Sequence, residues 1–397
     1  MTSISKKVKN IAESQTIAMT SLAKKLQAEG KNIISLSAGE PDFPTPENIK
    51  QAAIRAIQNN FTKYTENEGI PELREVVAQK FRKDNGLDVK ASNILVSNGG
   101  KHSIYNALQA VCDPGDEVII VTPYWVSFPE MVKLADAVPV ILRTKEKNGF
   151  TFTADDVEHL LTKKTKAMII NSPSNPAGSI LDEKTLRGIA EVAVKNDFFI
   201  ISDEIYEKII YDDGKHFSIG SIPEVKDKVI TIGGVSKAYA MTGWRIGFMA
   251  ANEEIIKSAA KVQSQVTSNP SSISQMAALE AVCCDQGEIE KMRASFQKRR
   301  DIAFNKLSKV RGLKTTKPSG AFYFFPSVRE LFGKRYDGTK LNNSFDVTHY
   351  ILTEAQVALV PGAAFGSDEH VRISFACSEN QLVEAIDRIA VAIEKLQ

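Results

Sequence analysis

Short, almost wholly apolar runs recur through the middle of the chain, and amphipathic stretches separate them. The clearest runs cover residues 93–96, 117–121, 167–170, 198–202 and 229–232, and the stretch 181–195 is typical of the segments between them. Strands that are buried on both faces appear as continuous apolar runs, whereas helices at a surface are amphipathic. Alternation of the two favours a parallel sheet with helical crossovers. The pattern therefore predicts an α/β protein.

One connection in this series is too short for a crossover helix. Little chain separates the run at 229–232 from the next apolar run at 246–250. Parallel neighbours need a connection of about a dozen residues or more, usually a helix. We therefore expect the last strand to run antiparallel to its neighbour.

The C-terminal part of the chain has a different pattern. A long charged helix is predicted at 288–309, followed by strand-like segments at 321–325 and 371–375. Ser378 and Gln381 form a capping-box pattern at the start of a final helix. The apolar stripe of that helix consists of Leu382, Ile386, Ile389, Ile393 and Leu396. These elements predict a second, smaller α+β domain.

The first forty-odd residues are expected to return to this smaller domain. Residues 32–37 are predicted to form a strand, and residues 41–46, which begin and end with proline, a rigid crossover.

Composition excludes several classes of protein. The 397 residues are 43% hydrophobic and 25% charged, and the net charge is +2 with the two signs interspersed. A chain of this length can bury a large core without disulfide bonds, and its charge gives no argument for binding nucleic acid. The four cysteines show no metal-ligand spacing, so we expect free thiols and no metal. No apolar run reaches the roughly 18–20 residues of a membrane span, and residues 1–10 lack the core of a signal peptide. We expect a cytoplasmic protein.

The decapeptide 236–245 holds the most specific chemistry. Lys237 follows a predicted strand, and its amine can form a Schiff base with an aldehyde. Arg245 can hold a phosphate through its planar guanidinium, and Ser236 can add a hydroxyl donor. Pyridoxal phosphate carries both an aldehyde and a phosphate. A surface lysine and a salt-bridged arginine are the structural alternatives.

Three polar residues could hold the ring of that cofactor. Asp203 lies at the carboxyl end of a buried strand, where it could pair with the pyridine nitrogen and keep it protonated. Tyr206 and Asn175 could each donate to the 3′-oxygen of the cofactor. As alternatives, Asp203 could cap a helix, and the Asn-Pro pair alone signals only a turn.

Further positions complete the predicted site. Gly99, Gly100 and Lys101 lie between a strand and a helical run, where backbone N–H groups can bind phosphate. Trp125 could stack on the pyridine ring. Arg372 lies in an apolar strand and needs an anionic partner, for which a substrate α-carboxylate is suited. An ordinary turn, core packing and a structural ion pair are the respective alternatives.

Together these motifs resemble the class I pyridoxal-phosphate-dependent aminotransferases of fold type I, and most closely their bacterial aspartate aminotransferase branch. The resemblance extends from the segment SLSAGEPDF at 35–43 to Arg372. It implies a large domain with a mostly parallel seven-stranded sheet flanked by helices, and a smaller α+β domain. The implied boundaries are 1–47 for a segment packed on the small domain, 48–290 for the cofactor-binding domain and 291–397 for the small domain. It also implies a homodimer with shared active sites.

The resemblance adds roles for individual residues. In that family the tyrosine that matches Tyr64 reaches the cofactor phosphate of the neighbouring subunit, and the glycine that matches Gly39 contacts substrate through its backbone. Asn175, Trp125 and Arg372 match residues that also contact substrate. The lysine that matches Lys101 binds the distal carboxylate of an acidic substrate, with help from residues that match Ser14 and Thr16.

The expected function is therefore aspartate aminotransferase: reversible, ping-pong amino transfer from L-aspartate to 2-oxoglutarate through a Schiff base at Lys237, giving oxaloacetate and L-glutamate. Two positions depart from the family pattern. Ala12 stands where relatives that accept prephenate often have lysine, and Gly234 stands where many relatives have a phosphate-binding serine.

Other functions stay open at this point. The same residues could serve an aromatic, alanine or prephenate transaminase, or a pyridoxal-phosphate lyase. A transcription regulator with an aminotransferase-like domain would also need a DNA-binding module, for which the residues before Ser35 are too few. Replacing Lys237 with alanine separates enzyme from regulator.

Overall fold

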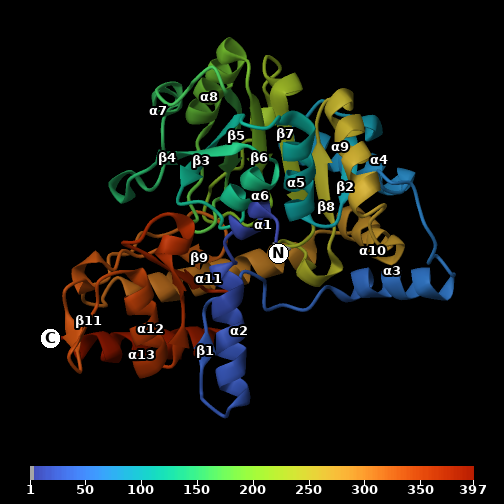
Figure 1. Cartoon of the computed structure of the whole chain (residues 1–397). Helices are drawn as coiled ribbons and strands as arrows, with labels where there is room; N and C mark the ends of the chain where they lie inside the picture. Colours follow the sequence, from blue (N-terminus) through green and yellow to red (C-terminus); the bar gives the residue numbers. More distant parts are fainter. Residues whose placement is uncertain (1–3) are drawn as a thin grey trace.

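A seven-stranded sheet forms the centre of the larger part of the molecule (Figure 1). The computed structural model describes residues 4–397. The strands follow the order β2-β8-β7-β6-β5-β3-β4. Their bounds are β2 Ile94–Ser97, β3 Glu117–Thr122, β4 Val138–Arg143, β5 Thr165–Asn171, β6 Phe199–Asp203, β7 Val229–Gly234 and β8 Gly247–Ala250. The predicted strands are all present within a residue or two of their expected bounds.

Strand β8 confirms the argument from the short connection. It runs antiparallel to both of its neighbours, β7 and β2, whereas the other pairs in the sheet are parallel. The seventh strand, β4, was not among the apolar runs identified from the sequence. It lies at the edge of the sheet, begins with exposed Val138 and contains Pro139, so its sequence lacks a continuous apolar pattern.

Helices cover both faces of this sheet, because successive strand residues point to opposite sides. On one face Val118 and Ile120 pack with α5 Gly100–Val111, α6 Phe128–Leu134 and α9 Glu253–Val266. The other face carries two clusters. One contains α3 Glu47–Gln58, α4 Pro71–Asn85 and α10 Ser272–Cys283, and the other contains α7 Ala154–Glu158 and α8 Glu183–Asn196.

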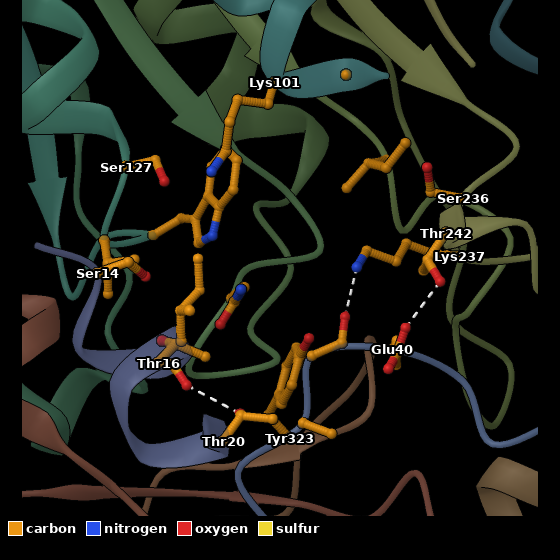
Figure 2. Close-up of a pocket in the computed structure, with 18 of the residues that line it drawn as sticks. Ser14, Thr16, Thr20, Glu40, Lys101, Ser127, Ser236, Lys237, Thr242 and Tyr323 are labelled. Carbon is orange, nitrogen blue, oxygen red and sulfur yellow. Dashed lines mark hydrogen bonds between the residues drawn. The ribbon is translucent and has the colours of Figure 1, made fainter. Parts of the chain in front are cut away.

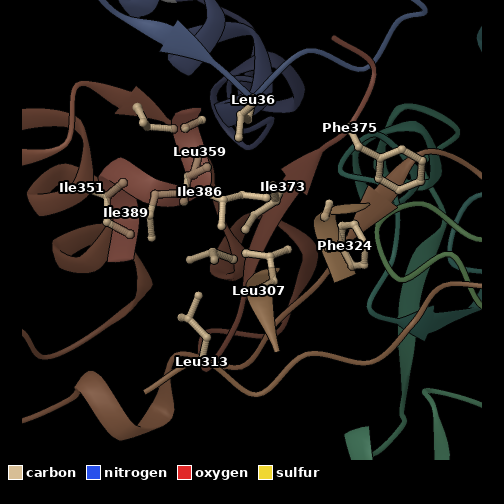
Figure 3. Packing of buried hydrophobic residues seen from close by; sticks show 14 of the residues in the cluster. Leu36, Leu307, Leu313, Phe324, Ile351, Leu359, Ile373, Phe375, Ile386 and Ile389 are labelled. Carbon is tan, nitrogen blue, oxygen red and sulfur yellow. The ribbon is translucent and has the colours of Figure 1, made fainter. Parts of the chain in front are cut away.

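The smaller part of the molecule is built on a three-stranded antiparallel sheet. Its order is β13-β14-β9, with β13 Val360–Pro361, β14 Val371–Ser374 and β9 Tyr323–Phe324. Helices α11 Gly287–Leu307, α12 Ser344–Glu354 and α13 Glu379–Glu394 contribute to a core that Figure 3 shows from close by. The apolar stripe predicted for the last helix is buried there, and the backbone N–H of Gln381 donates to the Ser378 hydroxyl as predicted. A two-stranded hairpin, β10 Arg335–Tyr336 with β11 Thr339–Lys340, completes this part.

The N-terminal segment packs on the smaller part. Strand β1 Ile34–Ser35 pairs in parallel with β12 Val357–Ala358, and helix α2 Gln15–Ala28 lies beside both (Figure 1). The strand is shorter than the predicted 32–37. The short helix α1 Lys6–Lys9 instead contacts the larger part, since Lys7 pairs with Asp136 at 2.6 Å. The N-terminal segment thus joins both parts of the molecule.

Among residues 4–397 no helix is both long and apolar enough to cross a membrane. The four cysteines form no disulfide within this part of the chain.

Candidate active site

A cavity of about 470 Å³ lies where the carboxyl ends of β6 and β7 meet α2 and the smaller part of the molecule (Figure 2). Its lining contains all the predicted site residues except Gly99 and Tyr64. Those that line it are Ser14, Thr16, Gly39, Gly100, Lys101, Trp125, Asn175, Asp203, Tyr206, Ser236, Lys237, Arg245 and Arg372. Residues from almost the whole length of the chain thus converge on one chamber.

Lys237 projects into the cavity just beyond β7. Its Nζ donates a hydrogen bond of 2.5 Å to the backbone oxygen of Gly39 (Figure 2). Burial lowers the pKa of the lysine to about 8, and the positive charge of Arg372 adds to the effect. A substantial fraction of the amine is therefore uncharged at mildly alkaline pH, which is the form that attacks an aldehyde.

Asp203 ends β6 and is only 5% exposed. Burial raises the pKa of its carboxyl to about 7, although the backbone N–H of Ile205, 3.3 Å away, and the charge of Lys237 both act in the opposite direction. Among residues 4–397 no cation forms a salt bridge with it. A buried carboxylate without a direct cationic partner suits a protonated ring nitrogen.

Gly99 and Arg245 lie together at the end of the site where the sequence predicts phosphate binding. Gly99 has a φ of +87°, and a Cβ there would lie 2.4 Å from Arg245 Nη2, so only glycine fits. Arg245 donates to the backbone oxygens of Thr242 and Asn98, at 2.8 and 3.3 Å, and no carboxylate in the described chain pairs with it. Since α5 begins at Gly100, its first N–H groups supply further donors for an anion.

Arg372 is the most unusual charge in the cavity. It is 1% exposed and donates to the Asn175 side chain at 3.1 Å and to the backbone oxygen of Ser37 at 2.7 Å. Its Nε has no hydrogen-bond partner, and none of residues 4–397 supplies it with a carboxylate. A guanidinium buried in this way is satisfied by an anionic ligand that accepts two hydrogen bonds.

The predicted distal-carboxylate residues also lie together. Lys101 Nζ is 5.0 Å from the centre of the Trp125 ring, and both line the cavity with Ser14 and Thr16. The hydroxyl of Thr16 is buried and has no partner among the described residues. This end of the cavity therefore offers a cation and an unpaired hydroxyl to a second anionic group.

Sequence reasoning missed several lining residues. Tyr323 donates to or accepts from Tyr206, with their hydroxyl oxygens 2.8 Å apart. Asn171 donates to the backbone oxygen of Asp203 at 2.9 Å, and Glu40 accepts from Thr242 at 2.8 Å. Glu40 lies within the segment 35–43 that carries the family resemblance, and Asn171 lies four residues before Asn175, whereas Tyr323 lies in a segment identified only as a strand.

A second cluster of buried charges lies next to Asp203 in the chain. Glu204 is 1% exposed and accepts from Ser202, Ser218, His216 and Asn85. These four donors occupy its oxygens, so Glu204 is satisfied by protein groups although it lies in an acidic cluster that could otherwise hold a metal ion. Burial opposes protonation of His216, but attraction to Glu204 outweighs it and raises the pKa of the histidine.

Tyr64 lies outside the cavity, and its side chain is 91% exposed. The role expected for it, in the active site of a neighbouring subunit, remains a prediction.

The residues present fit pyridoxal phosphate on three counts: a buried amine, a buried carboxylate without a direct cationic partner, and a glycine–arginine anion site. The family model described as aminotransferase class I and II matches residues 31–389. The chain belongs to this family. The predicted class of enzyme, a pyridoxal-phosphate-dependent aminotransferase, and the predicted fold are thereby confirmed.

Individual members of the aminotransferase family are similar over their full length. A protein of Bacillus sp. (strain YM-2) named aspartate aminotransferase is 45% identical over 387 residues, which are 97% of this chain and 98% of that protein. A protein of Rickettsia bellii named probable aspartate/prephenate aminotransferase is 46% identical over 399 residues, 100% of both chains. The solved structure of aspartate aminotransferase from Thermus thermophilus with maleate has a TM-score of 0.94 and 41% identity, covering 99% of this chain and 100% of that one.

Proposed function

We propose that this aminotransferase transfers the amino group of L-aspartate to 2-oxoglutarate. The observation that carries the proposal is the buried, carboxylate-free Arg372, which lines one cavity together with the cation of Lys101 and the reactive amine of Lys237. An acidic amino acid has two carboxylates and one amine to match these three groups. The names of the Bacillus and Thermus relatives agree with this choice.

Prephenate is the second candidate, because the Rickettsia relative is named for both substrates. In this chain position 12 is alanine, whose backbone N–H is bonded to Glu130 at 3.0 Å. Ala12 offers no side-chain cation for an additional carboxylate. This favours aspartate as the principal donor.

The chemistry divides among the residues as follows. Pyridoxal phosphate, when bound, supplies an aldehyde carbon for the amino group and a ring that withdraws electrons from the substrate Cα. Arg245, the N–H groups at the start of α5 and the Ser236 hydroxyl hold the phosphate. Asp203 would hold the ring nitrogen in its protonated form, and Trp125 would offer a flat surface for the ring.

Other side chains act on the substrate. Arg372 binds the α-carboxylate, and Lys101 and Thr16 bind the distal one, so the Cα–H bond is oriented toward Lys237. Nζ of Lys237 takes the proton from the substrate Cα and holds it, and could deliver it to the adjacent carbon that bound pyridoxal phosphate would supply. The raised proportion of free amine at this lysine suits it to that task.

The remaining expectations extend the proposal. We propose that the small domain, 291–397, closes over the cofactor-binding domain, 48–290, when substrate binds. We also propose a homodimer in which the exposed Tyr64 completes the partner's site; its 91% exposure leaves the ring free for such a contact. The expected cytoplasmic location and the absence of nucleic-acid partners stay predictions.

The test uses purified protein loaded with pyridoxal phosphate. L-Aspartate alone should convert the visible absorbance of the bound cofactor to that of its amino form, and 2-oxoglutarate should reverse the change. The Lys237→Ala variant serves as the control and should show neither change at a comparable rate. Conversion with prephenate or an aromatic donor but not with aspartate would refute the proposed specificity, and steady release of ammonia would indicate a lyase.

A further inference from the structure

Tyr323 is a buried tyrosine in the cavity wall to which neither the sequence motifs nor the family pattern assigned a role. It begins β9, its side chain is 0% exposed, and it lines the cavity. Its ring packs against Phe322, with centroids 4.7 Å apart, and against Tyr206 at 5.9 Å. Packing on two sides fixes the position of the hydroxyl. Figure 2 shows Tyr323 among the residues that line the cavity.

This one ring touches three parts of the proposed site. Its hydroxyl lies 2.8 Å from that of Tyr206, the residue expected at the 3′-oxygen of the cofactor. The guanidinium of Arg372, expected at the α-carboxylate, stacks over its face at 4.5 Å. A Cβ on Gly39 would come within 3.3 Å of the same hydroxyl. Tyr323 is therefore in direct contact with both the cofactor end and the carboxylate end of the cavity.

The number of hydrogens on the two phenols decides the direction of their bond. Each hydroxyl has one hydrogen to donate, and burial raises the pKa of both groups, so both stay protonated over the working pH range. If Tyr206 gives its hydrogen to the cofactor, it must accept from Tyr323. If Tyr206 instead donates to Tyr323, it has none left for the cofactor.

We propose that Tyr323 is a positioning residue that donates its hydroxyl hydrogen to Tyr206 and so directs the hydrogen of Tyr206 into the cavity, toward the 3′-oxygen of the cofactor. The inference rests on the proposed cofactor site and deepens it. Chained hydrogen bonds strengthen one another, so Tyr206 becomes a better donor because it accepts one. The stacked positive charge of Arg372 polarises the Tyr323 hydroxyl further in the same direction.

The consequence is measurable without turnover. A donor to the 3′-oxygen favours the anionic form of that oxygen, and so lowers the pH at which the bound cofactor loses its proton. In Tyr323→Phe the ring remains under Arg372, but Tyr206 loses its donor. We expect the pH midpoint of the cofactor's visible absorbance to rise by about 0.1–0.7 unit, from a strengthening of roughly 10–30% in one charge-assisted hydrogen bond.

Two further variants make the test specific. In Tyr206→Phe the midpoint should rise more, and adding Tyr323→Phe to it should change the midpoint no further, since Tyr323 acts through Tyr206. Tyr211→Phe is the matched control, because Tyr211 is also buried and bonds the backbone oxygen of Ala321, outside the cavity. It should leave the midpoint unchanged.

Equilibrium binding of succinate, a dicarboxylate probe, separates a positioning role from damage to the carboxylate site. The affinity of Tyr323→Phe for succinate should stay within about threefold of wild type, because the stacked ring remains, while kcat falls more than KM rises. A midpoint that falls or stays constant in Tyr323→Phe, or additive shifts in the double variant, would overturn the inference. If the wild-type protein binds the cofactor but does not react with aspartate, the proposed specificity fails while the midpoint comparison still stands.

Discussion

Asp203 allows the electrostatics of the cavity to be tested in two opposite directions with one substitution. Burial raises the pKa of its carboxyl from 3.8 to about 7 in the protein alone. When folding raises the pKa of a carboxyl, the unfolding free energy of the protein falls as pH rises from the unfolded pKa to the folded pKa of that group. A shift of about three units corresponds to about 4 kcal/mol, since each unit is worth about 1.36 kcal/mol. About 3 kcal/mol of this falls between pH 5 and pH 8.

Asparagine at position 203 cannot ionise, so Asp203→Asn removes this penalty. Between pH 5 and pH 8 the cofactor-free wild type should lose about 3 kcal/mol more of its unfolding free energy than the cofactor-free variant. Urea unfolding at both pH values measures the difference, and Asp213→Asn, at an exposed aspartate, is the matched control.

With cofactor the sign reverses. The protonated ring would lose a buried counter-ion in Asp203→Asn, and breaking such a pair costs about 3–5 kcal/mol, or a roughly 10²- to 10⁴-fold weaker Kd for the cofactor. Equal pH dependence of the two cofactor-free proteins would show that the carboxyl is not desolvated as described. An unchanged cofactor Kd would show that it does not face the ring.

Three further substitutions test other parts of the structure. Gly99→Ala places a methyl group at a φ of +87° and 2.4 Å from Arg245, and should weaken cofactor binding at least tenfold in an equilibrium titration, whereas unchanged affinity would remove Gly99 from the phosphate site. His216→Gln should destabilise the protein by about 2–3 kcal/mol at pH 6, because Glu204 loses a charged partner. Folding raises the pKa of His216, so the stabilisation by the charged histidine is complete below its unfolded pKa and is lost as pH rises through its folded pKa. The destabilisation by His216→Gln, measured by urea unfolding, should therefore be smaller at pH 9 than at pH 6. The same destabilisation at both pH values would refute the pairing of His216 with Glu204. Burial lowers the pKa of His370 from 6.5 to about 4. Between pH 6.5 and pH 4 the wild type should therefore lose about 3 kcal/mol of unfolding free energy that His370→Gln does not lose. Parallel curves of unfolding free energy against pH for the two proteins would contradict the burial of His370 as a neutral ring.

Much of the sheet could be predicted because its strands are buried on both faces. Such strands have no polar side, so each appears in the sequence as an uninterrupted apolar run. The edge strand β4 could not be found in this way, since exposed Val138 and Pro139 interrupt its pattern. Short strands such as β9 and β1 were placed correctly but predicted too long, because only a few of their apolar residues meet a partner strand.

The candidate site divides along a similar line. The chemistry of three residues could be predicted from the residues next to them in the sequence: Lys237, Asp203 and Arg245. The structure brings all three to one cavity. Tyr323 could not be assigned from its strand, where an aromatic residue is ordinary core. Its role depends on contacts with Tyr206 and Arg372 that lie far away in the sequence. The lack of a carboxylate partner for Arg372 likewise depends on which residues surround it in space, and the sequence alone does not give these.

The pairing of β1 with β12 bears on how the chain acquires its function during synthesis. Ile34 is made long before Val357, so this contact joins residues that lie far apart in the chain. Contacts of such long range form slowly, and domains built from earlier residues tend to fold first. The seven-stranded sheet can therefore assemble while α2 is still without its neighbour. Because Arg372 is made after the whole seven-stranded sheet, a chain synthesised only as far as the sheet could hold a folded sheet and yet have no closed chamber in which to bind a carboxylate.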